Sequence, residues 1–288
     1  MSESGISVVM ATRNRLPRLR ESLSAITKSL IRVFNTEIIV WDNDSSDGTK
    51  EYLQGYEKFL NDLPGGLVNC SLKVVYHDKN VGLSAINKAM KMTNPKHYYL
   101  VKMDDDVVEI PNCWHCKLKE VFDKIPEAGF IASWHKNDDK LPQDGIFKRI
   151  KDEDHYKHKT IKDIPLAIGD AAGGLVMTTR DVYDKVGGFV EMDKEGIFYF
   201  SEDFDYSAKC RNHGLIAGFR MDMQVHHLFG WEYNKEFKGL TIEKFTNWLC
   251  QKGFKDKTDE ERVDLLRLMS MDDEIIPDII KNYHKENG

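Results

Sequence analysis

Strand-like and helix-like segments alternate through the first third of the chain, and this alternation constrains the fold more than any other feature. Amphipathic helical patterns, the first opened by Pro17, separate four short apolar segments. These segments are Ile6 to Ala11, Glu37 to Trp41, Leu72 to Tyr76 and Tyr98 to Met103. Strands that alternate with helices form a mostly parallel sheet covered by helices. We therefore predict a doubly wound α/β fold.

Polar side chains follow each predicted strand. They lie in Thr12 to Arg15, Asp42 to Asp44, His77 to Asn80 and Asp104 to Asp106. In such sheets, ligands bind outside the carboxyl ends of the strands. Turn chemistry alone also favours Asn and Asp in loops, so the inference depends on the coincidence of four polar loops at one edge. Together they predict a nucleotide-binding rim.

Three consecutive carboxylates, Asp104, Asp105 and Asp106, end the fourth predicted strand. Like charges repel one another, so we expect a cation beside them. Hard oxygen ligands suit Mg²⁺ or Mn²⁺, and such a metal screens the charge of a diphosphate. From these residues alone, a solvated acidic turn is an equal alternative.

Composition excludes some classes of protein. The 288 residues are enough for one large or two small domains, and a net charge of -6 argues against a protein that mainly grips nucleic acid. Five cysteines are too few and odd in number for a disulfide framework, which favours a reducing compartment. The chain shows neither a signal-peptide pattern nor an apolar stretch of transmembrane length, so we expect a cytoplasmic protein.

Four separated motifs resemble the inverting family 2 glycosyltransferases of the GT-A fold. They are Ser7 to Arg15, Asp42 to Thr49, Asp104 to Asp106 and Ser201 to Asp205. The resemblance implies a GT-A domain over residues 1–232, followed by a C-terminal helical extension over residues 233–288. It also implies a Mn²⁺- or Mg²⁺-dependent enzyme that moves a sugar, with inversion, from a nucleoside-diphosphate sugar to an acceptor hydroxyl. The acceptor class implied is a glycan, free or linked to lipid or protein, and peripheral contact with a membrane stays open.

By this resemblance, Asp104 and Asp106 form the DxD motif, with Asp104 near the ribose and Asp106 on the metal. The first two loops would hold the base and the ribose. The donor-binding residues implied are Thr12, Arg13, Asn14, Asp42, Asn43, Asn80, Asp104, Asp105 and Gly174. Asn43 stands where the commonest family pattern has an aspartate, and this weakens the assumption of a uridine donor.

The second half of the chain carries an acid pair, Glu202 and Asp203, at the start of a predicted helix. An inverting transfer needs a base that takes the proton of the acceptor hydroxyl. The resemblance assigns this role to Asp203, with Glu202 as the second choice. Carboxylates are also favoured at helix starts by the helix dipole alone.

Two adjacent histidines, His226 and His227, follow the acid pair. In the galactofuranosyl- and rhamnosyltransferase-like branch of the family, a histidine at this separation completes the metal shell beside Asp106. His227 has the better register, and His226 stays open. This branch favours dTDP-rhamnose or UDP-galactofuranose as the donor. Asp170, in a glycine-rich segment, is a candidate sugar contact.

Two further segments and two further functions complete the expectations. Residues 135–165 are polar and lack periodicity, which predicts a mobile loop over the site, and apolar stripes between residues 242 and 268 predict helices. A sugar nucleotidyltransferase would show a glycine-rich, basic loop after the first strand, whereas residues 12–15 contain no glycine. A non-catalytic binding protein of the same fold would not need both the DxD motif and the acid pair.

Overall fold

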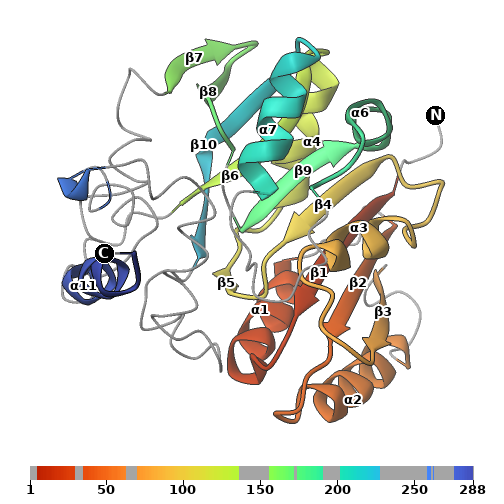
Figure 1. The fold of residues 1–288 in the computed structure, drawn as a ribbon. Helices are drawn as coiled ribbons and strands as arrows, with labels where there is room; N and C mark the ends of the chain where they lie inside the picture. The colour runs from red at the N-terminus through yellow and green to blue at the C-terminus, as the bar shows by residue number, and fades with distance from the viewer. Residues whose placement is uncertain are drawn as a thin grey trace. The chain divides into compact units, whose positions relative to one another are not determined.

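The computed structural model describes residues 5–29, 35–62, 70–135, 156–171, 174–190, 202–227, 258–260, 262 and 276–287. By its contacts the chain divides into two compact units, residues 1–136 with 156–227 and residues 137–155 with 228–288. In the second unit the structure describes one long helix, α11 (Ile276–Asn287) (Figure 1). The apolar stripes between residues 242 and 268 lie almost wholly outside the described residues, so the helices predicted there stay a prediction.

The first unit alternates strands with helices, as the sequence predicts. Its elements are β1 (Ile6–Thr12), α1 (Leu16–Ser29), β2 (Thr36–Asn43), α2 (Thr49–Asn61), β3 (Cys70–His77), α3 (Ser84–Met90), β4 (Tyr99–Met103), β5 (Val107–Glu109), α4 (Trp114–Lys124), β6 (Ala128–His135), β7 (Lys157–Ile161), β8 (Ile164–Ile168), β9 (Leu175–Thr179), α6 (Arg180–Val186), α7 (Glu202–Asn212) and β10 (Ile216–His227).

The strands form one mixed sheet. Within the described residues the order is β3-β2-β1-β4-β9-β6-β10-β8-β7, and β5 pairs with β10 off this path. The first four strands along the chain pair in parallel. β9 runs antiparallel to both β4 and β6, and β10 runs parallel to β6. The carboxyl ends of β1, β2, β3, β4 and β10 and the start of β9 therefore meet at the same edge of the sheet.

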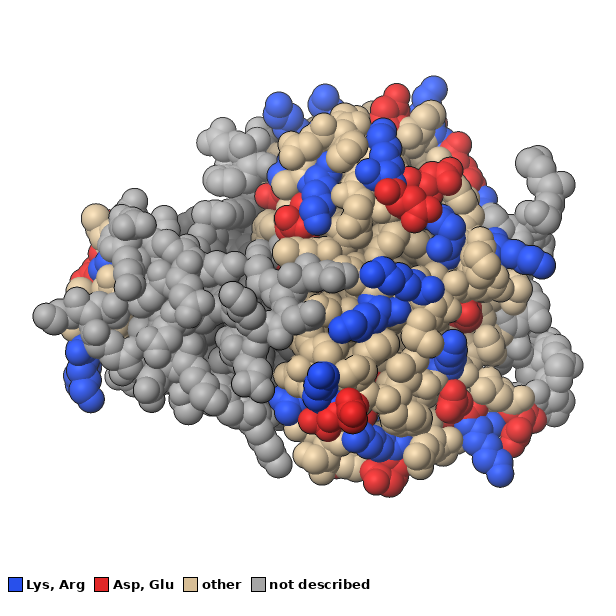
Figure 2. Space-filling model, turned by 45° about the vertical axis from the view of Figure 1, so that its right-hand side comes forward, with Lys and Arg blue, Asp and Glu red and all other residues tan. Residues whose placement is uncertain are grey.

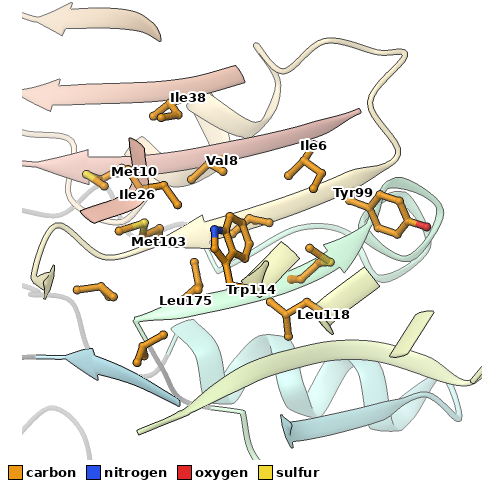
Figure 3. Close-up of a cluster of buried hydrophobic side chains, with 14 of the residues drawn as sticks. Ile6, Val8, Met10, Ile26, Ile38, Tyr99, Met103, Trp114, Leu118 and Leu175 are labelled. Atoms are coloured by element: carbon orange, nitrogen blue, oxygen red, sulfur yellow. The ribbon is translucent and has the colours of Figure 1, made fainter. Parts of the chain in front are cut away.

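One face of the sheet packs against α1, α2 and α4. Alternate residues of β1 and β4 point to this face, because side chains alternate along a strand. They meet the apolar stripe of α1, whose members recur at helical spacing. Figure 3 shows part of this core, in which Trp114 of α4 lies beside Met103 and Leu175. The cluster includes Ile6, Val8, Met10, Leu19, Leu23, Ile26, Tyr99, Val101, Met103, Trp114, Leu118 and Leu175, all of them buried.

The other face packs against α7 and the segment after α6 through aromatic rings. The ring of Tyr206 lies 4.5 Å from that of Phe189 and 4.6 Å from that of Phe130, between centroids. The hydroxyl of Ser207 donates to the carbonyl of Asp203, one turn earlier in α7. This packing fixes the start of α7, which carries the acid pair, against the middle of the sheet.

Part of the predicted mobile loop is instead a hairpin at the edge of the sheet. β7 and β8 pair antiparallel, and the turn between them has two residues with positive φ, Lys162 (52°) and Asp163 (65°). Two such residues make the turn that suits the twist of paired strands, and lysine is an unusual choice there. The prediction for residues 135–165 is therefore wrong from Lys157 onward, and residues 136–155 lie outside the described ranges. Across the described ranges, each helix is too short or too polar to traverse a bilayer.

Candidate active site

Three side chains from two distant segments of the chain form a group with the composition of a metal site. Asp104 and Asp106 follow β4, and His227 ends β10, so the parallel direction of these strands brings them together. One ligand atom from each lies within 4.8 Å of the other two. Nε2 of His227 lies 2.8 Å from Oδ1 of Asp106 and 3.6 Å from Oδ2 of Asp104. Two carboxylates and an imidazole fit a divalent cation of the Mn²⁺ type.

His227, and not His226, faces this group. β10 pairs with β5 so that His227 lies opposite Val107 and His226 lies opposite Glu109. Nδ1 of His226 lies 3.7 Å from Oε1 of Glu109, and His226 is not part of the metal-binding group found among the described residues. The structure thus brings together the residues predicted as metal ligands, with His227 in the register that the sequence favours.

The lack of a side chain at Gly174 leaves the space that the His227 ring occupies. A Cβ atom at this position would approach Cγ2 of Val107 to 2.3 Å and Cδ2 of His227 to 2.9 Å. The carbonyl of Gly174 accepts a hydrogen bond of 2.7 Å from the amide of Asp104. A side chain here would displace both a candidate ligand and the strand end that carries the aspartates.

Arg15 bridges Asp105 and Asp106, a contact that sequence reasoning missed. Its guanidinium lies 2.6 Å from Oδ1 of Asp105 and 2.9 Å from Oδ2 of Asp106. The hydroxyl of Thr12 donates to Oδ2 of Asp105 at 2.7 Å. Asp105 is thereby held inside the protein between two residues of the first loop, while His227 approaches the other oxygen of Asp106.

Lys102 was also missed, although a lysine inside an otherwise apolar strand is a visible signal. Its ammonium lies 2.8 Å from Oε1 of Glu202, and 2.9 Å and 3.0 Å from the two oxygens of Asp203. It also lies 3.2 Å from Oδ1 of Asp104. The acid pair of α7 and the aspartates after β4 therefore belong to one polar cluster.

This acidic cluster carries more negative than positive charge. Its members are Asp104, Asp105, Asp106, Glu202, Asp203, Lys102, Arg15 and His227. Five carboxylates face two permanent cations and one histidine. On the outer face drawn in Figure 2, by contrast, Lys and Arg side chains are interspersed with Asp and Glu. An excess of buried negative charge attracts a cation. The candidate metal-binding group of Asp104, Asp106 and His227 lies within this cluster.

The pKa values of the cluster reflect this surplus. Burial, with the neighbouring Asp106 and Asp104, raises the pKa of Asp105 to about 6 despite Arg15. Burial, with Glu202 and Asp104, raises the pKa of Asp203 to about 7 despite Lys102. The pKa of Asp106 is lowered, because His227 and Arg15 outweigh its burial.

The two cationic partners have raised pKa values. Burial opposes the charge of His227, but Asp106 and Asp104 outweigh it, so the pKa of His227 is raised. Burial likewise opposes the charge of Lys102, and the surrounding carboxylates hold its pKa well above the ordinary range. The surrounding carboxylates therefore favour the charged form of both groups.

The predicted base-binding residues form the rim beside this cluster. Asn43 and Asn80 contact each other, with 2.6 Å between Nδ2 and Oδ1, and the amide of Val81 donates to Oδ1 of Asn43 at 2.8 Å. Asn14, at a positive φ of 52°, accepts from the amide of Ser46 at 2.7 Å. These asparagines join neighbouring loops to one another and so shape the rim.

Among the described residues of the rim, two buried polar side-chain atoms have no hydrogen-bond partner. They are Oδ1 of Asp42 and Nε of Arg13, which are both buried. Burial raises the pKa of Asp42, which is completely covered. An unsatisfied buried oxygen and an unsatisfied buried nitrogen at the ends of adjacent strands fit a polar ligand with both donors and acceptors. Asp170, in contrast, forms an ion pair with Arg211 on the surface and is not part of the acidic cluster.

The family model for Glycosyl transferase family 2 matches residues 7–187. The chain belongs to glycosyl transferase family 2. The match spans the strands that carry the rim and the aspartates, and it ends before the acid pair and His227. The comparison with curated proteins finds no match.

Solved structures show the same fold at low identity. The mannosyltransferase PcManGT from Pyrobaculum calidifontis, in complex with GDP-Man and Mn²⁺, superposes with a TM-score of 0.58 at 17% identity over 98% of this chain and 70% of its own. GalNAc-T7 with UDP, GalNAc and Mn²⁺ gives 0.56 at 19% identity over 78% of this chain and 43% of its own.

TarS from S. aureus (residues 1–349), in complex with UDP-GlcNAc, gives a TM-score of 0.53 at 16% identity over 97% of this chain and 71% of its own. The family match and these likenesses establish the GT-A fold, with its largely parallel sheet covered by helices.

Proposed function

We propose that this member of glycosyl transferase family 2 is a metal-dependent inverting glycosyltransferase, in which Asp203 is the general base. One observation carries the proposal. The carboxylate of Asp203 belongs to the same buried cluster as the candidate metal-binding group of Asp104, Asp106 and His227, and Lys102 links the two. An acceptor and an activated sugar can therefore meet there.

In the proposed reaction, the acceptor oxygen forms a bond to the anomeric carbon as the bond from that carbon to the diphosphate breaks. The electron pair of the broken bond leaves with the diphosphate, and the acceptor proton moves to Asp203. A carboxyl with a pKa of about 7 suits this task, because a general base works best when its pKa lies near the operating pH. Glu202 shares the ammonium of Lys102 and is the second choice.

A bound divalent metal would stabilise the charge that develops on the departing diphosphate. Asp104, Asp106 and His227 would hold it, and Arg15 would be left to balance Asp105. Because Mg²⁺ prefers oxygen ligands, the imidazole of His227 favours Mn²⁺ over Mg²⁺.

For the donor, we propose that Asp42 and Arg13 contact the base and that the Asn43–Asn80 pair, Thr12 and Asn14 shape the loops around it. The unsatisfied oxygen of Asp42 suits a ring N–H, as found in uracil, thymine or guanine. A histidine ligand on β10 supports placement in the galactofuranosyl- and rhamnosyltransferase-like branch, with UDP-galactofuranose or dTDP-rhamnose as donors to a glycan hydroxyl. The GDP- and UDP-linked sugars named for the structural neighbours belong in the same screen.

The test screens UDP-, GDP- and dTDP-sugars for Mn²⁺-dependent hydrolysis, with water as the acceptor, and measures nucleoside diphosphate binding by thermal shift. We expect the Asp203→Asn variant to lose at least about 100-fold in kcat and to bind the nucleoside diphosphate as the unchanged protein does. Asp205→Asn is the matched control, because Asp205 lies in the same turn but pairs with Lys209 at 2.8 Å.

Normal turnover by Asp203→Asn would show that the base assignment is wrong. A nucleotidyltransferase would instead make the sugar nucleotide from a sugar phosphate and a nucleoside triphosphate, with release of pyrophosphate. A non-catalytic protein would give a thermal shift without hydrolysis of any donor.

A further inference from the structure

Lys102 is a buried cation in the middle of the sheet, outside the set of residues that would touch donor, metal or acceptor. It lies on β4 between Val9 of β1 and Val176 of β9, and it is only 3% exposed. An ammonium in such surroundings is costly unless each of its protons meets an acceptor. The contacts of Lys102 must therefore account for its presence in a strand that is otherwise apolar.

The acceptors come from two distant parts of the chain. One ammonium contacts Glu202 at 2.8 Å, Asp203 at 2.9 Å and 3.0 Å, and Asp104 at 3.2 Å. Glu202 and Asp203 begin α7, whereas Asp104 follows β4 directly. Lys102 is thus a direct polar link between the acid pair and the aspartates of the donor side.

Stability alone is a weak reason for this arrangement. A buried ion pair is often no more stabilising than well-packed apolar side chains of similar volume. Leu100, two residues before Lys102 and on the same face of β4, is fully buried and apolar. The strand can therefore hold an apolar side chain at such depth, and the ammonium needs another explanation.

We propose that Lys102 is a positioning residue of the transfer reaction, which holds the Asp203 carboxylate at a fixed place relative to the donor side of the site. A carboxylate has about four lone-pair positions, so an ammonium that contacts both oxygens leaves acceptor capacity for a substrate hydroxyl. This role depends on the proposed function, because it acts through the base and not through a contact with the substrate.

The experiment compares Lys102→Met with Lys102→Arg, using the sugar nucleotide that the unchanged protein hydrolyses fastest among UDP-, GDP- and dTDP-sugars with Mn²⁺. We expect Lys102→Met to lower kcat about 100-fold with KM changed less than about threefold, and Lys102→Arg to restore part of kcat. Lys209→Met is the matched control, since Lys209 contacts Asp205 at 2.8 Å on the same helix and its loss should leave kcat unchanged.

The decisive measurement adds Lys102→Met to Asp203→Asn. If Lys102 acts through Asp203, the double variant loses less than about threefold beyond Asp203→Asn alone, because coupled residues are not additive. An equal further loss in both backgrounds would overturn the proposal. So would a weaker Kd for UDP, GDP or dTDP with an unchanged kcat, which would place Lys102 in donor binding.

Two controls separate the possible failures. Thermal unfolding shows whether Lys102→Met is folded, and if it is not, Lys102→Arg in both backgrounds gives the same comparison with the charge retained. If the unchanged protein neither binds a nucleoside diphosphate nor hydrolyses any donor, the proposed function fails, and the role of Lys102 fails with it. Activity of the unchanged protein with a Lys102→Met variant of normal kcat overturns the role of Lys102 alone.

Discussion

Two buried polar groups of side chains lie at opposite ends of the same strands. The acidic cluster is at the carboxyl ends, and an amino-edge network of Ser7, Glu37, Asn94 and His97 lies at the other. In this network Glu37 accepts from the hydroxyl of Ser7 and from the amide of Asn94, and Nδ1 of His97 lies 3.0 Å from the oxygen of Ser7. One carboxylate thus meets several donors.

The two groups differ in how their charge is balanced. Burial lowers the pKa of His97, so this histidine stays neutral beside Glu37. In the acidic cluster, burial and mutual repulsion raise the pKa values of Asp105 and Asp203 to about 6 and about 7. A network that only stabilises the fold satisfies its groups internally, whereas the acidic cluster keeps a surplus that a cation can neutralise.

At both edges of the sheet, a histidine ring packs closely against a glycine. A Cβ on Gly5 would approach Cδ2 of His97 to 2.3 Å, as a Cβ on Gly174 would approach His227 to 2.9 Å. The local packing is therefore similar at the two edges, and the difference between them lies in charge. Variants at matched positions can test this comparison directly.

The largest effect should follow removal of a candidate metal ligand. We expect Asp106→Ala to weaken Mn²⁺-dependent nucleoside diphosphate binding at least about 100-fold, because changes even outside the ligand shell of a metal cost 10- to 100-fold. Titration calorimetry with UDP, GDP and dTDP, with and without Mn²⁺, measures this. Glu37→Gln at the amino edge should leave the metal-dependent affinity unchanged, and equal losses in both variants would remove the distinction between the edges.

The glycine pair should separate stability from metal binding. Gly174→Ala and Gly5→Ala should each destabilise the protein by about 1–3 kcal/mol, because both overpack a filled site. Only Gly174→Ala should also weaken Mn²⁺ binding, since its Cβ displaces His227. Chemical denaturation and Mn²⁺ titration of both variants check this, and unchanged Mn²⁺ affinity in folded Gly174→Ala would count against His227 as a ligand.

Local patterns were enough to predict much of this molecule. The alternation of strands and helices predicts the parallel half of the sheet, and strand ends predict where Asp104 and Asp106 lie. His227 was implied by the resemblance to one branch of the family and not by a local pattern, and the structure brings its imidazole to the aspartates. The predictions made from the strands hold because strand direction and side-chain alternation are encoded within a few residues.

Contacts between distant segments were not predictable in the same way. Lys102 contacts Asp203, about a hundred residues away in the sequence, and Arg15 contacts Asp106, about ninety residues away. Both contacts depend on the order of the strands and on where a helix packs against the sheet. The hairpin of β7 and β8 was missed because its turn uses Lys162 where glycine or asparagine is the usual signal. The ion pair of Asp170 with Arg211 likewise depends on where α7 packs, and the sugar contact suggested for Asp170 stays a prediction.

The affinity for Mn²⁺ should depend on pH through His227. A ligand histidine must be neutral, and Asp106 and Asp104 raise the pKa of His227. Below that pKa, the affinity should fall about tenfold for each pH unit, because a proton competes with the metal. Fluorescence or spin-resonance titrations between about pH 5 and pH 8 measure it. His97→Gln should not alter the slope, and a flat profile in the unchanged protein would exclude His227 as a ligand.

The smallest effect should be a loss of stability with rising pH in the metal-free protein. Asp203, with its pKa raised from 3.8 to about 7, holds a proton in the folded protein that the unfolded chain has already released. Its contribution is complete below pH 3.8 and is lost as the pH rises through about 7, which amounts to roughly 1 kcal/mol between pH 6 and pH 8.

His97 has the opposite sign, because its lowered pKa favours the folded state as the pH rises through 6.5. His97→Gln should therefore steepen the decline, whereas Asp203→Asn should flatten it. Urea denaturation with a chelator, repeated with Mn²⁺, measures both slopes. If the stability of Asp203→Asn still falls with pH as much as that of the unchanged protein, Asp203 is not the group that releases the proton. The contrast between the two edges would then need another cause.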